Sequence, residues 1–383
     1  MRYTKRIILC ICLFINGCVE PYMPAVIVAD NNYLVIDGFL IGNDSTFITL
    51  SRTQTIADAT TFEGETRAMV QIESESGKIY TLVEKNNGRY VAPPLGLGLA
   101  DQYRLRIKTH NSHEYLSEYA SIISSAMIDS VTFEEDLEKD AIDFKIFAHD
   151  EENNSPYYLW TYDETWMYSA GYSVYYYQDG QMVPRARADE FYFCWKTLPG
   201  NNIYLHSTTA LAQDVVYDYH LFSIPQTSRK LYHGYSILVK QYALTREAHE
   251  YWTLTKKNSE SLGGLFDPMP SQAASNFRCV SHPDEPVIGH FSASTVNKKR
   301  LLFLRSEITG PRTGPYGPTG YEDCESEIIE LADISPETLQ GKLVVDRYYD
   351  IVTQELVGYT VAPEECIDCR FQGGTTQRPA YWR

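Results

Sequence analysis

The sequence predicts a mainly β protein: an N-terminal immunoglobulin-like or transthyretin-like sandwich, followed by a larger β-rich domain with one amphipathic helix. Two observations lead to this fold class. Short segments of alternating apolar and polar residues recur between turn signals, which is typical of half-buried strands. Only one segment combines helical periodicity with helix-capping residues. The length of 383 residues indicates two or three domains, and 30 tyrosines supply ample material for packed cores.

The first domain is expected over residues 33–125. Six strand-like segments lie between turn signals such as Ser76-Gly77 and Asn86-Asn87-Gly88, namely residues 33–40, 46–50, 68–74, 78–84, 88–92 and 103–109. Short strands at such regular spacing over about 90 residues indicate an immunoglobulin-like or transthyretin-like sandwich.

The second domain is expected over residues 126–383. Its strand-like segments are residues 143–148, 157–164, 172–177, 203–207, 235–242, 287–294 and 300–305, with a final hairpin of residues 343–349 and 355–361. A loop rich in proline and glycine spans residues 310–320. Thr245 can cap a helix over residues 246–258, with Glu247 in the first turn and Lys256 and Lys257 in the last. Ala248, Tyr251, Trp252 and Thr255 share one face of it, so the helix is expected to pack on a sheet.

Residues 1–17 are predicted to be a lipoprotein signal peptide. A short positive region precedes the apolar run of residues 7–15, whose helix would reach about 14 Å, under half of a bilayer core of about 30 Å. Cys18 closes the motif Ile15-Asn16-Gly17-Cys18, which resembles a bacterial lipobox, so Cys18 is the predicted lipid attachment site. The alternative is a plain secretory signal with an incidental cysteine. Residues 18–32 would form a tether between the lipid and the fold.

The charge of the mature chain bears on its partners. Removing Arg2, Lys5 and Arg6 changes the formal net charge from -17 to -20. An acidic surface repels phosphates, so we expect no nucleic-acid partner. The membrane contact is expected through the N-terminal lipid.

Five cysteines follow Cys18 and are disulfide candidates in an oxidising compartment: Cys194, Cys279, Cys324, Cys366 and Cys369. Sequence alone leaves the pairing open, and the odd number leaves one thiol over. The motif Cys366-x-x-Cys369 could be half of a zinc site, a redox pair or part of a disulfide set. No second ligand pair accompanies it, so a structural disulfide, joining Cys324 to one of the two, is the favoured interpretation.

No catalytic signature survives inspection, and we predict neither enzymatic activity nor a cofactor or metal site. His249-Glu250 and His113-Glu114 each begin a helical zinc motif, but Thr253 and Ser117 stand where the second histidine is needed. The chain contains neither a nucleophile elbow nor a phosphate-binding loop. An unrecognised hydrolase remains the third-ranked alternative, because a glycosidase needs only two carboxylates.

Aromatic residues crowd residues 157–177. Exposed rings could stack on sugar or contact peptide. The favoured interpretation is that alternate rings fill a core while the others form cross-strand pairs. Candidate ligand or partner contacts are Trp166, Tyr316 and Tyr321, and the last two lie in or beside the glycine-rich loop.

Several segments in a fixed order resemble a family of Bacteroidota outer-membrane lipoproteins catalogued as domain of unknown function 4249. The residues that carry this are residues 235–242, Glu250-Tyr251-Trp252, residues 264–270, Pro286-Val287-Ile288-Gly289-His290-Phe291 and Lys299-Arg300, and at the end of the chain Cys366-Ile367-Asp368-Cys369-Arg370, Gly373-Gly374 and Pro379-Ala380-Tyr381-Trp382. Val35-Ile36-Asp37-Gly38 and Ile128-Asp129-Ser130 extend the resemblance over nearly the whole mature chain. His290 and Tyr381 depart from the pattern, in which tyrosine and phenylalanine are usual at these places.

The resemblance implies an outer-membrane lipoprotein, lipid-anchored and facing the cell exterior. It would act as a non-enzymatic accessory of a TonB-dependent β-barrel transporter, in substrate capture or gating. No catalytic residues follow from the resemblance. Only Glu20 is acidic close behind Cys18, so the acidic cluster that often marks surface display is missing. The alternative is a free-standing surface adhesin or a glycan- or peptide-binding module.

Overall fold

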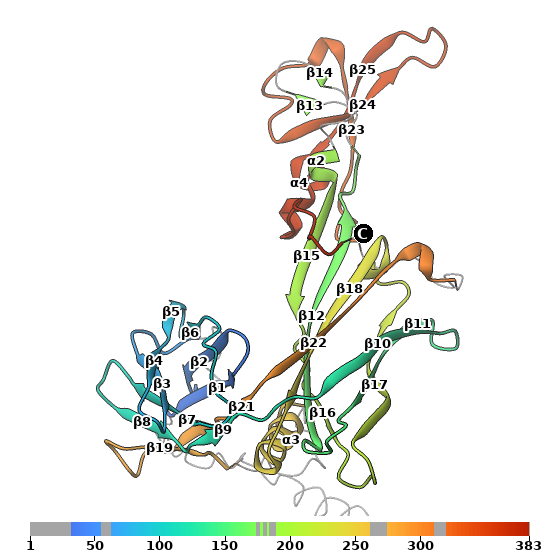
Figure 1. Ribbon diagram of the computed structural model, residues 1–383. Helices are drawn as coiled ribbons and strands as arrows, with labels where there is room; N and C mark the ends of the chain where they lie inside the picture. Colours follow the sequence, from blue (N-terminus) through green and yellow to red (C-terminus); the bar gives the residue numbers. More distant parts are fainter. Residues whose placement is uncertain are drawn as a thin grey trace, which may run out of the picture.

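The computed structural model describes residues 32–54, 63–173, 177–178, 182–183, 189–260, 274–309 and 319–382. The signal peptide, Cys18 and nearly all of the predicted tether lie outside these residues. Figure 1 shows three parts: an N-terminal sandwich, a long central pair of sheets, and a small sheet at the far end from the sandwich. The mainly β fold class is confirmed.

The N-terminal sandwich has two sheets. The strands that come from residues 34–121 are β1 (Leu34–Ile41), β2 (Thr46–Arg52), β3 (Met69–Ser74), β4 (Ile79–Thr81), β5 (Val83–Asn86), β6 (Arg89–Ala92), β7 (Gln102–Lys108), β8 (Glu114–Ser117) and β9 (Ala120–Ser121). One sheet has the order β20-β1-β2-β6-β5, and the other β19-β8-β7-β3-β4. A single core takes side chains from both, including Leu50, Ile72 and Leu105, all fully buried. Alternation along each strand therefore points one face of each sheet inward.

The sandwich is not made by residues 33–125 alone, which corrects the expected boundary. Strands β19 (Phe277–Cys279), β20 (Val287–Gly289) and β21 (Ala293–Ser294) return from the second half of the chain. Strands β20 and β21 pair with β1 in parallel, and β19 pairs with β8. The expected continuous strand over residues 287–294 is thus divided in two. Pairing between such distant segments depends on tertiary packing and leaves no local pattern.

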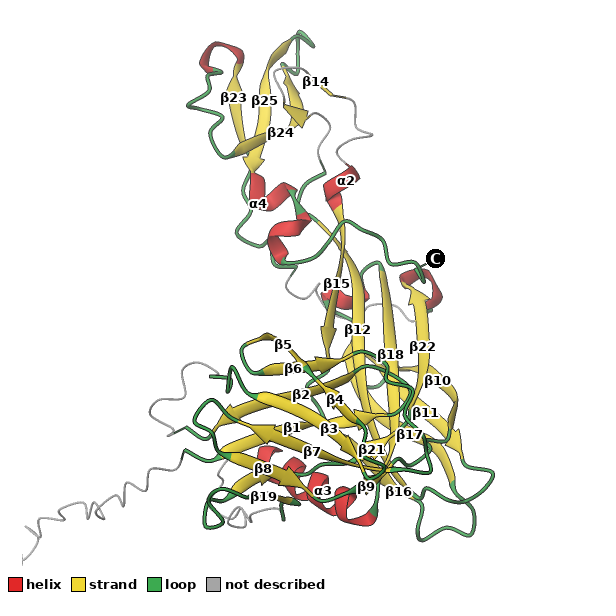
Figure 2. Ribbon diagram, turned by 60° about the vertical axis from the view of Figure 1, so that its left-hand side comes forward, coloured by secondary structure: helices red, strands yellow, loops and turns green. Residues whose placement is uncertain are grey.

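The central part is a second pair of sheets (Figure 2). One sheet has the order β10-β11-β17, from β10 (Met127–Asp136), β11 (Ala141–His149) and β17 (Val215–Pro225). The other has the order β15-β12-β18-β22, from β15 (Phe193–Pro199), β12 (Tyr157–Ser169), β18 (Gly234–Ala243) and β22 (Val296–Leu304), with β16 (Tyr204–Ser207) also on β12. Side chains of both sheets share one core.

Strand β12 shows where the crowded aromatic residues go. Tyr158, Trp160, Tyr162, Trp166 and Tyr168 are all buried in the central core. Tyr158 and Trp160 stack with ring centroids 5.4 Å apart. These rings fill the core, as the favoured interpretation expected. Nothing is described for residues 174–176, so part of the expected strand over residues 172–177 lies outside the described residues.

Helix α3 (Arg246–Glu260) is the predicted amphipathic helix, two residues longer than expected. The Thr245 hydroxyl accepts a hydrogen bond from the Ala248 amide at 3.1 Å, which confirms the predicted cap. Trp252 on its inner face stacks on Phe39 of β1, with centroids 5.4 Å apart. The helix thereby contacts both the sandwich and the central sheets. None of the described helices is long and apolar enough to cross a bilayer.

The distal sheet has the order β23-β25-β24, from β23 (Glu327–Glu330), β24 (Lys342–Tyr349) and β25 (Leu356–Pro363). Strands β24 and β25 form the predicted final hairpin. The short β13 (Tyr177–Gln178) and β14 (Met182–Val183) lie beside this sheet (Figure 1). Helices α2 (Asp189–Tyr192) and α4 (Glu364–Ile367) lie where the distal part joins the central sheets.

Candidate functional site

Two disulfides join the end of the chain to its central and distal parts. Cys194 on β15 is bonded to Cys369, and Cys324 is bonded to Cys366, each with a Cα–Cα distance of 5.7 Å. Cys366 and Cys369 therefore have different partners, and Cys324 joins one of them as the favoured interpretation had it. Cys279 is buried and in no disulfide, so its place among the disulfide candidates is corrected.

The predicted contact residues are placed differently from what the sequence suggested. Trp166 is only 4% exposed, in the central core, with the Lys230 ammonium 5.2 Å from its ring centroid. It offers no free ring to a ligand, because alternation along β12 turns it inward. Tyr316 lies outside the described residues.

Tyr321 lies in a hollow of about 370 Å³ that we call the tyrosine hollow. Its lining includes Tyr168, Tyr172, Tyr192, Arg229, Tyr232 and Tyr321. Tyr321 is half-buried rather than exposed, and its hydroxyl is enclosed without a hydrogen-bond partner. Burial raises its pKa to about 12. The Arg229 guanidinium lies over the Tyr168 ring at 5.3 Å and donates to the carbonyl of Thr319 at 2.7 Å.

A larger cavity of about 580 Å³, the junction cavity, lies where the sandwich meets α3. Residues 118–121 form one wall, the first turns of α3 another, and residues 274–276 and 290–293 a third, while Ile123, Ala243 and Thr245 complete the lining. Its volume falls within the range of roughly 300–1,000 Å³ found for ligand sites, which favour the boundaries between domains. Tyr251, His290 and Phe291, from segments that carry the family resemblance, are among its lining residues.

Acidic groups dominate the charge of the junction cavity. Glu118, Glu247 and Glu250 line it, and among its described lining residues there is no lysine or arginine. Glu250 is paired with Arg246 at 2.9 Å on the exposed side of the helix. Burial lowers the pKa of His290, which keeps its imidazole neutral near pH 7. A cationic or neutral polar ligand is therefore favoured over an anionic one.

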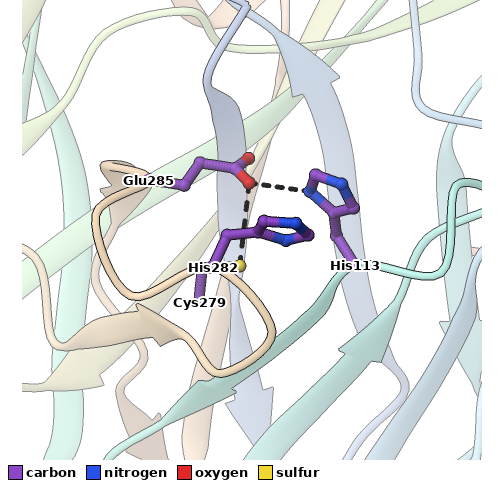
Figure 3. Close-up of side chains that lie close together, drawn as sticks. All are labelled: His113, Cys279, His282 and Glu285. Carbon is purple, nitrogen blue, oxygen red and sulfur yellow. Dashed lines mark hydrogen bonds and ion pairs between the residues drawn. The ribbon is translucent and has the colours of Figure 1, made fainter.

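A third group of residues, the His-Cys-Glu cluster, lies at the edge of the sandwich (Figure 3). It consists of His113, Cys279, His282 and Glu285, whose potential ligand atoms all lie within 4.8 Å of one another. His113 directly precedes β8 and Cys279 ends β19, so the antiparallel pairing of these strands brings the two together. His282 and Glu285 come from the loop that follows β19.

Glu285 is the centre of the cluster's hydrogen bonds. Its Oε2 lies 2.7 Å from Nδ1 of His113 and 3.7 Å from Sγ of Cys279. Its Oε1 accepts a hydrogen bond from the Tyr115 hydroxyl at 2.6 Å and lies 3.5 Å from Arg52. Burial acts to raise the pKa of Glu285, but the hydrogen bonds from Tyr115 and His113 and the nearby positive charges outweigh it and lower the pKa.

Sequence reasoning missed this cluster and predicted no metal site. The spacing Cys279-x-x-His282-x-x-Glu285 was a usable signal, since it places three potential ligands in seven residues. His113 and Glu114 match only the start of a helical zinc motif, whereas His113 directly precedes strand β8. Its partners are more than 160 residues away in the sequence, so only tertiary pairing reveals them.

The fold and these sites define a multi-sheet β protein whose N-terminal sandwich is completed by a later segment. The model of the family described as Domain of unknown function (DUF4249) matches residues 19–300. The chain belongs to this family, as the sequence resemblance indicated.

Other comparisons add little. No curated protein matches the chain. A crystal structure of a mutant of Salmonella alpha-2-macroglobulin matches with 9% sequence identity and a TM-score of 0.19. The alignment covers 88% of this chain and 18% of that one, so the chain spans about a fifth of its length. We draw nothing from a likeness this low.

Proposed function

We propose that this protein is an outer-membrane lipoprotein that captures a small ligand beside a TonB-dependent β-barrel transporter, as a non-enzymatic accessory. The junction cavity is the observation that carries ligand capture. It has the volume of a ligand site, lies at a boundary between structural parts and has both apolar and polar walls. Its acidic lining favours a cationic or neutral polar ligand.

The location outside the cytoplasm has two supports. The N-terminal signal with Cys18 predicts export and lipid attachment. The two disulfides are typical of an oxidising compartment. We expect a Cys18→Ala variant to lose its membrane attachment and to incorporate no labelled fatty acid. A variant that stays in the membrane fraction would contradict lipid anchoring.

The tip of the β24–β25 hairpin is our candidate contact with the transporter. Ile351 and Val352 are 84% and 88% exposed there. The Asp350 carboxylate accepts hydrogen bonds from the amides of Val352 and Thr353 at 2.8 and 2.7 Å, which orders the turn. These two aliphatic side chains are exposed to solvent on an ordered turn. Their burial against a partner protein would therefore be favourable. The tip lies at the end of the molecule away from the sandwich (Figure 2).

The experiment is purification of the full-length lipidated protein from native outer membranes in mild detergent, with mass spectrometry of its partners. We expect a β-barrel receptor in stoichiometric amount, lost in an Ile351→Asp, Val352→Asp double variant. Leu137→Asp is the matched control, because Leu137 is also an exposed aliphatic residue, at 68%, on another hairpin turn. Repeated recovery of a solitary lipoprotein would overturn the transporter role.

A second candidate function, glycan or peptide binding by a free-standing surface protein, is favoured by the tyrosine hollow. Tyrosine rings and an arginine side by side suit stacking on sugars and contacts with peptides. Tyr321→Ala should weaken binding on glycan and peptide arrays. Tyr217→Ala is the control, since this ring is 81% exposed elsewhere. Equal binding by both variants would exclude this role for the hollow.

A further inference from the structure

We propose that the His-Cys-Glu cluster binds one zinc ion, which fastens the segment after β19 to the N-terminal sandwich. Among the described residues this is the only group of histidine, cysteine and acidic side chains close enough to share an ion. The proposal is independent of the transporter role.

The donor set points to a borderline-soft transition metal. A thiolate, two imidazoles and a carboxylate are all zinc ligands, and calcium or magnesium would be expected to have oxygen ligands instead. Four protein ligands with none left to water are typical of structural zinc sites. The spacing of Cys279, His282 and Glu285 lets one short loop supply three of the four ligands.

The distances are compatible with coordination. Ligand atoms around a tetrahedral zinc lie about 3.3–3.8 Å from one another, given bonds of about 2.0–2.3 Å. One potential ligand atom from each of the four residues lies within 4.8 Å of the other three. Movements of about 1 Å would therefore bring these atoms to the distances that a tetrahedral zinc ion requires. The rings of His113 and His282 are already side by side, with centroids 4.1 Å apart, as Figure 3 shows.

The surroundings of Glu285 resemble the outer shell of a metal site. Ligating carboxylates are commonly held by a second hydrogen bond that fixes their orientation. Here the fully buried Tyr115 donates to Oε1 of Glu285 at 2.6 Å, and the other oxygen faces His113 and Cys279. The carboxylate is thus oriented toward the remaining ligands.

The alternative to a metal site is a purely structural ion pair between His113 and Glu285, with the Cys279 thiol binding no metal. It accounts for the 2.7 Å contact. It does not account for His282, an exposed residue whose ring stacks on His113, or for an unpaired cysteine in a protein that forms two disulfides. A bound ion would give both residues a function and protect the thiol.

A zinc ion here would strengthen the contact between strand β8 and the later segment that contains β19. Strand β19 is the edge strand of its sheet, with three residues paired to β8. Short edge strands gain little from ladder hydrogen bonds. Coordination would tie β19 and the following loop to His113, and through them hold the segment that continues to β20 and the junction cavity.

The test uses the mature chain without a histidine tag, stripped by a chelator and titrated with Zn²⁺ in a calorimeter. We expect one ion per chain and at least a tenfold loss of affinity in Cys279→Ser and in His282→Ala. His110→Ala is the matched control, because His110 is an exposed histidine three residues from His113 and outside the cluster. It should bind as the unaltered protein does.

Cobalt supplies a second readout. Co²⁺ in place of zinc should give a thiolate-to-metal charge-transfer band in the near ultraviolet, absent in Cys279→Ser. Zn²⁺ should also raise the Tm of the unaltered protein but not that of His282→Ala. If Cys279→Ser fails to fold, two measurements still test the proposal. They are the zinc affinity of His282→Ala, a substitution at an exposed residue, and the cobalt spectrum of the unaltered chain. The absence of saturable one-to-one binding, or equal affinity in His282→Ala, would overturn the proposal.

Discussion

The indole N–H of Trp160 donates a hydrogen bond to Oε1 of Gln241 at 2.8 Å in the completely buried core between the central sheets. The amide nitrogen of the same glutamine donates to the carbonyl of Ala126 at 2.8 Å. Gln241 thereby satisfies the fully buried indole N–H on β12 and the part-buried carbonyl of Ala126 on the segment that enters β10. A buried polar group without a partner would be costly, so this side chain is specified by its neighbours.

Replacing Gln241 should destabilise the central part strongly. Gln241→Leu keeps the side-chain volume nearly the same but leaves the Trp160 N–H and the Ala126 carbonyl without this partner. We expect the free energy of unfolding to fall by about 3 kcal/mol. Urea unfolding followed by tryptophan fluorescence measures it. Gln213→Leu, at an exposed glutamine, should change the free energy of unfolding by less than about 0.5 kcal/mol. Equal effects of the two substitutions would contradict the assigned role.

The two disulfides should differ in their contribution to stability. Cys194–Cys369 spans 175 residues and Cys324–Cys366 spans 42, which in the chain-entropy model gives about 5 and about 4 kcal/mol when each is taken alone. The double variant Cys194→Ser, Cys369→Ser should therefore have the lower Tm of the two paired-serine variants. Peptide mapping under non-reducing conditions checks the pairing itself. Any linkage that includes Cys279 would refute it.

His149 should titrate above its ordinary pKa. Its Nδ1 lies 2.8 Å from the Asp129 carboxylate, and this hydrogen bond and charge raise the histidine pKa above 6.5. A raised pKa in the folded state adds stability that is fully present below about pH 6.5 and is lost as the pH rises through the folded value. Asp129→Asn should bring the NMR titration of His149 back toward 6.5. His290 is the internal reference, because burial lowers its pKa.

Occlusion of the junction cavity should abolish ligand retention. Ala274 is exposed and lines this cavity, so Ala274→Trp adds bulk there without disturbing the core. Native mass spectrometry of protein taken from its own membranes should show a bound small molecule that this variant lacks. Ala212→Trp, at an exposed alanine in the loop before β17, should retain it. If both variants keep the same molecule, that molecule binds elsewhere.

Much of the secondary structure followed from local patterns. The strands that became β2, β3, β6 and β7 were predicted with boundaries close to those observed, because each alternates apolar and polar residues and ends at a turn signal. Thr245 marked the start of α3 through its hydroxyl, which is a purely local interaction. Strand β17 was missed, since two register shifts in its pairing with β11 break the regular alternation of apolar and polar residues along it.

The candidate sites were less accessible to sequence reasoning. Tyr321 was expected to be exposed beside the glycine-rich loop but is half-buried in the tyrosine hollow, and Trp166 proved to be a core residue. The sequence pattern gives the alternation of β12, but only the position of the opposing sheet decides which of its faces is enclosed.

By itself the sequence determined the mainly β class, helix α3, the final hairpin and the family, because each of these depends on local periodicity, capping or short motifs. The tertiary structure alone decided that residues 277–294 complete the N-terminal sandwich, that Cys194 pairs with Cys369, and that His113 meets Glu285. The physical reason is distance along the chain. Closing loops of more than 100 residues costs an entropy that varies only slowly with loop length, so sequence separation does not single out one distant partner over another. The choice among partners is made by packing and hydrogen bonding over the whole core, which no local window of residues contains.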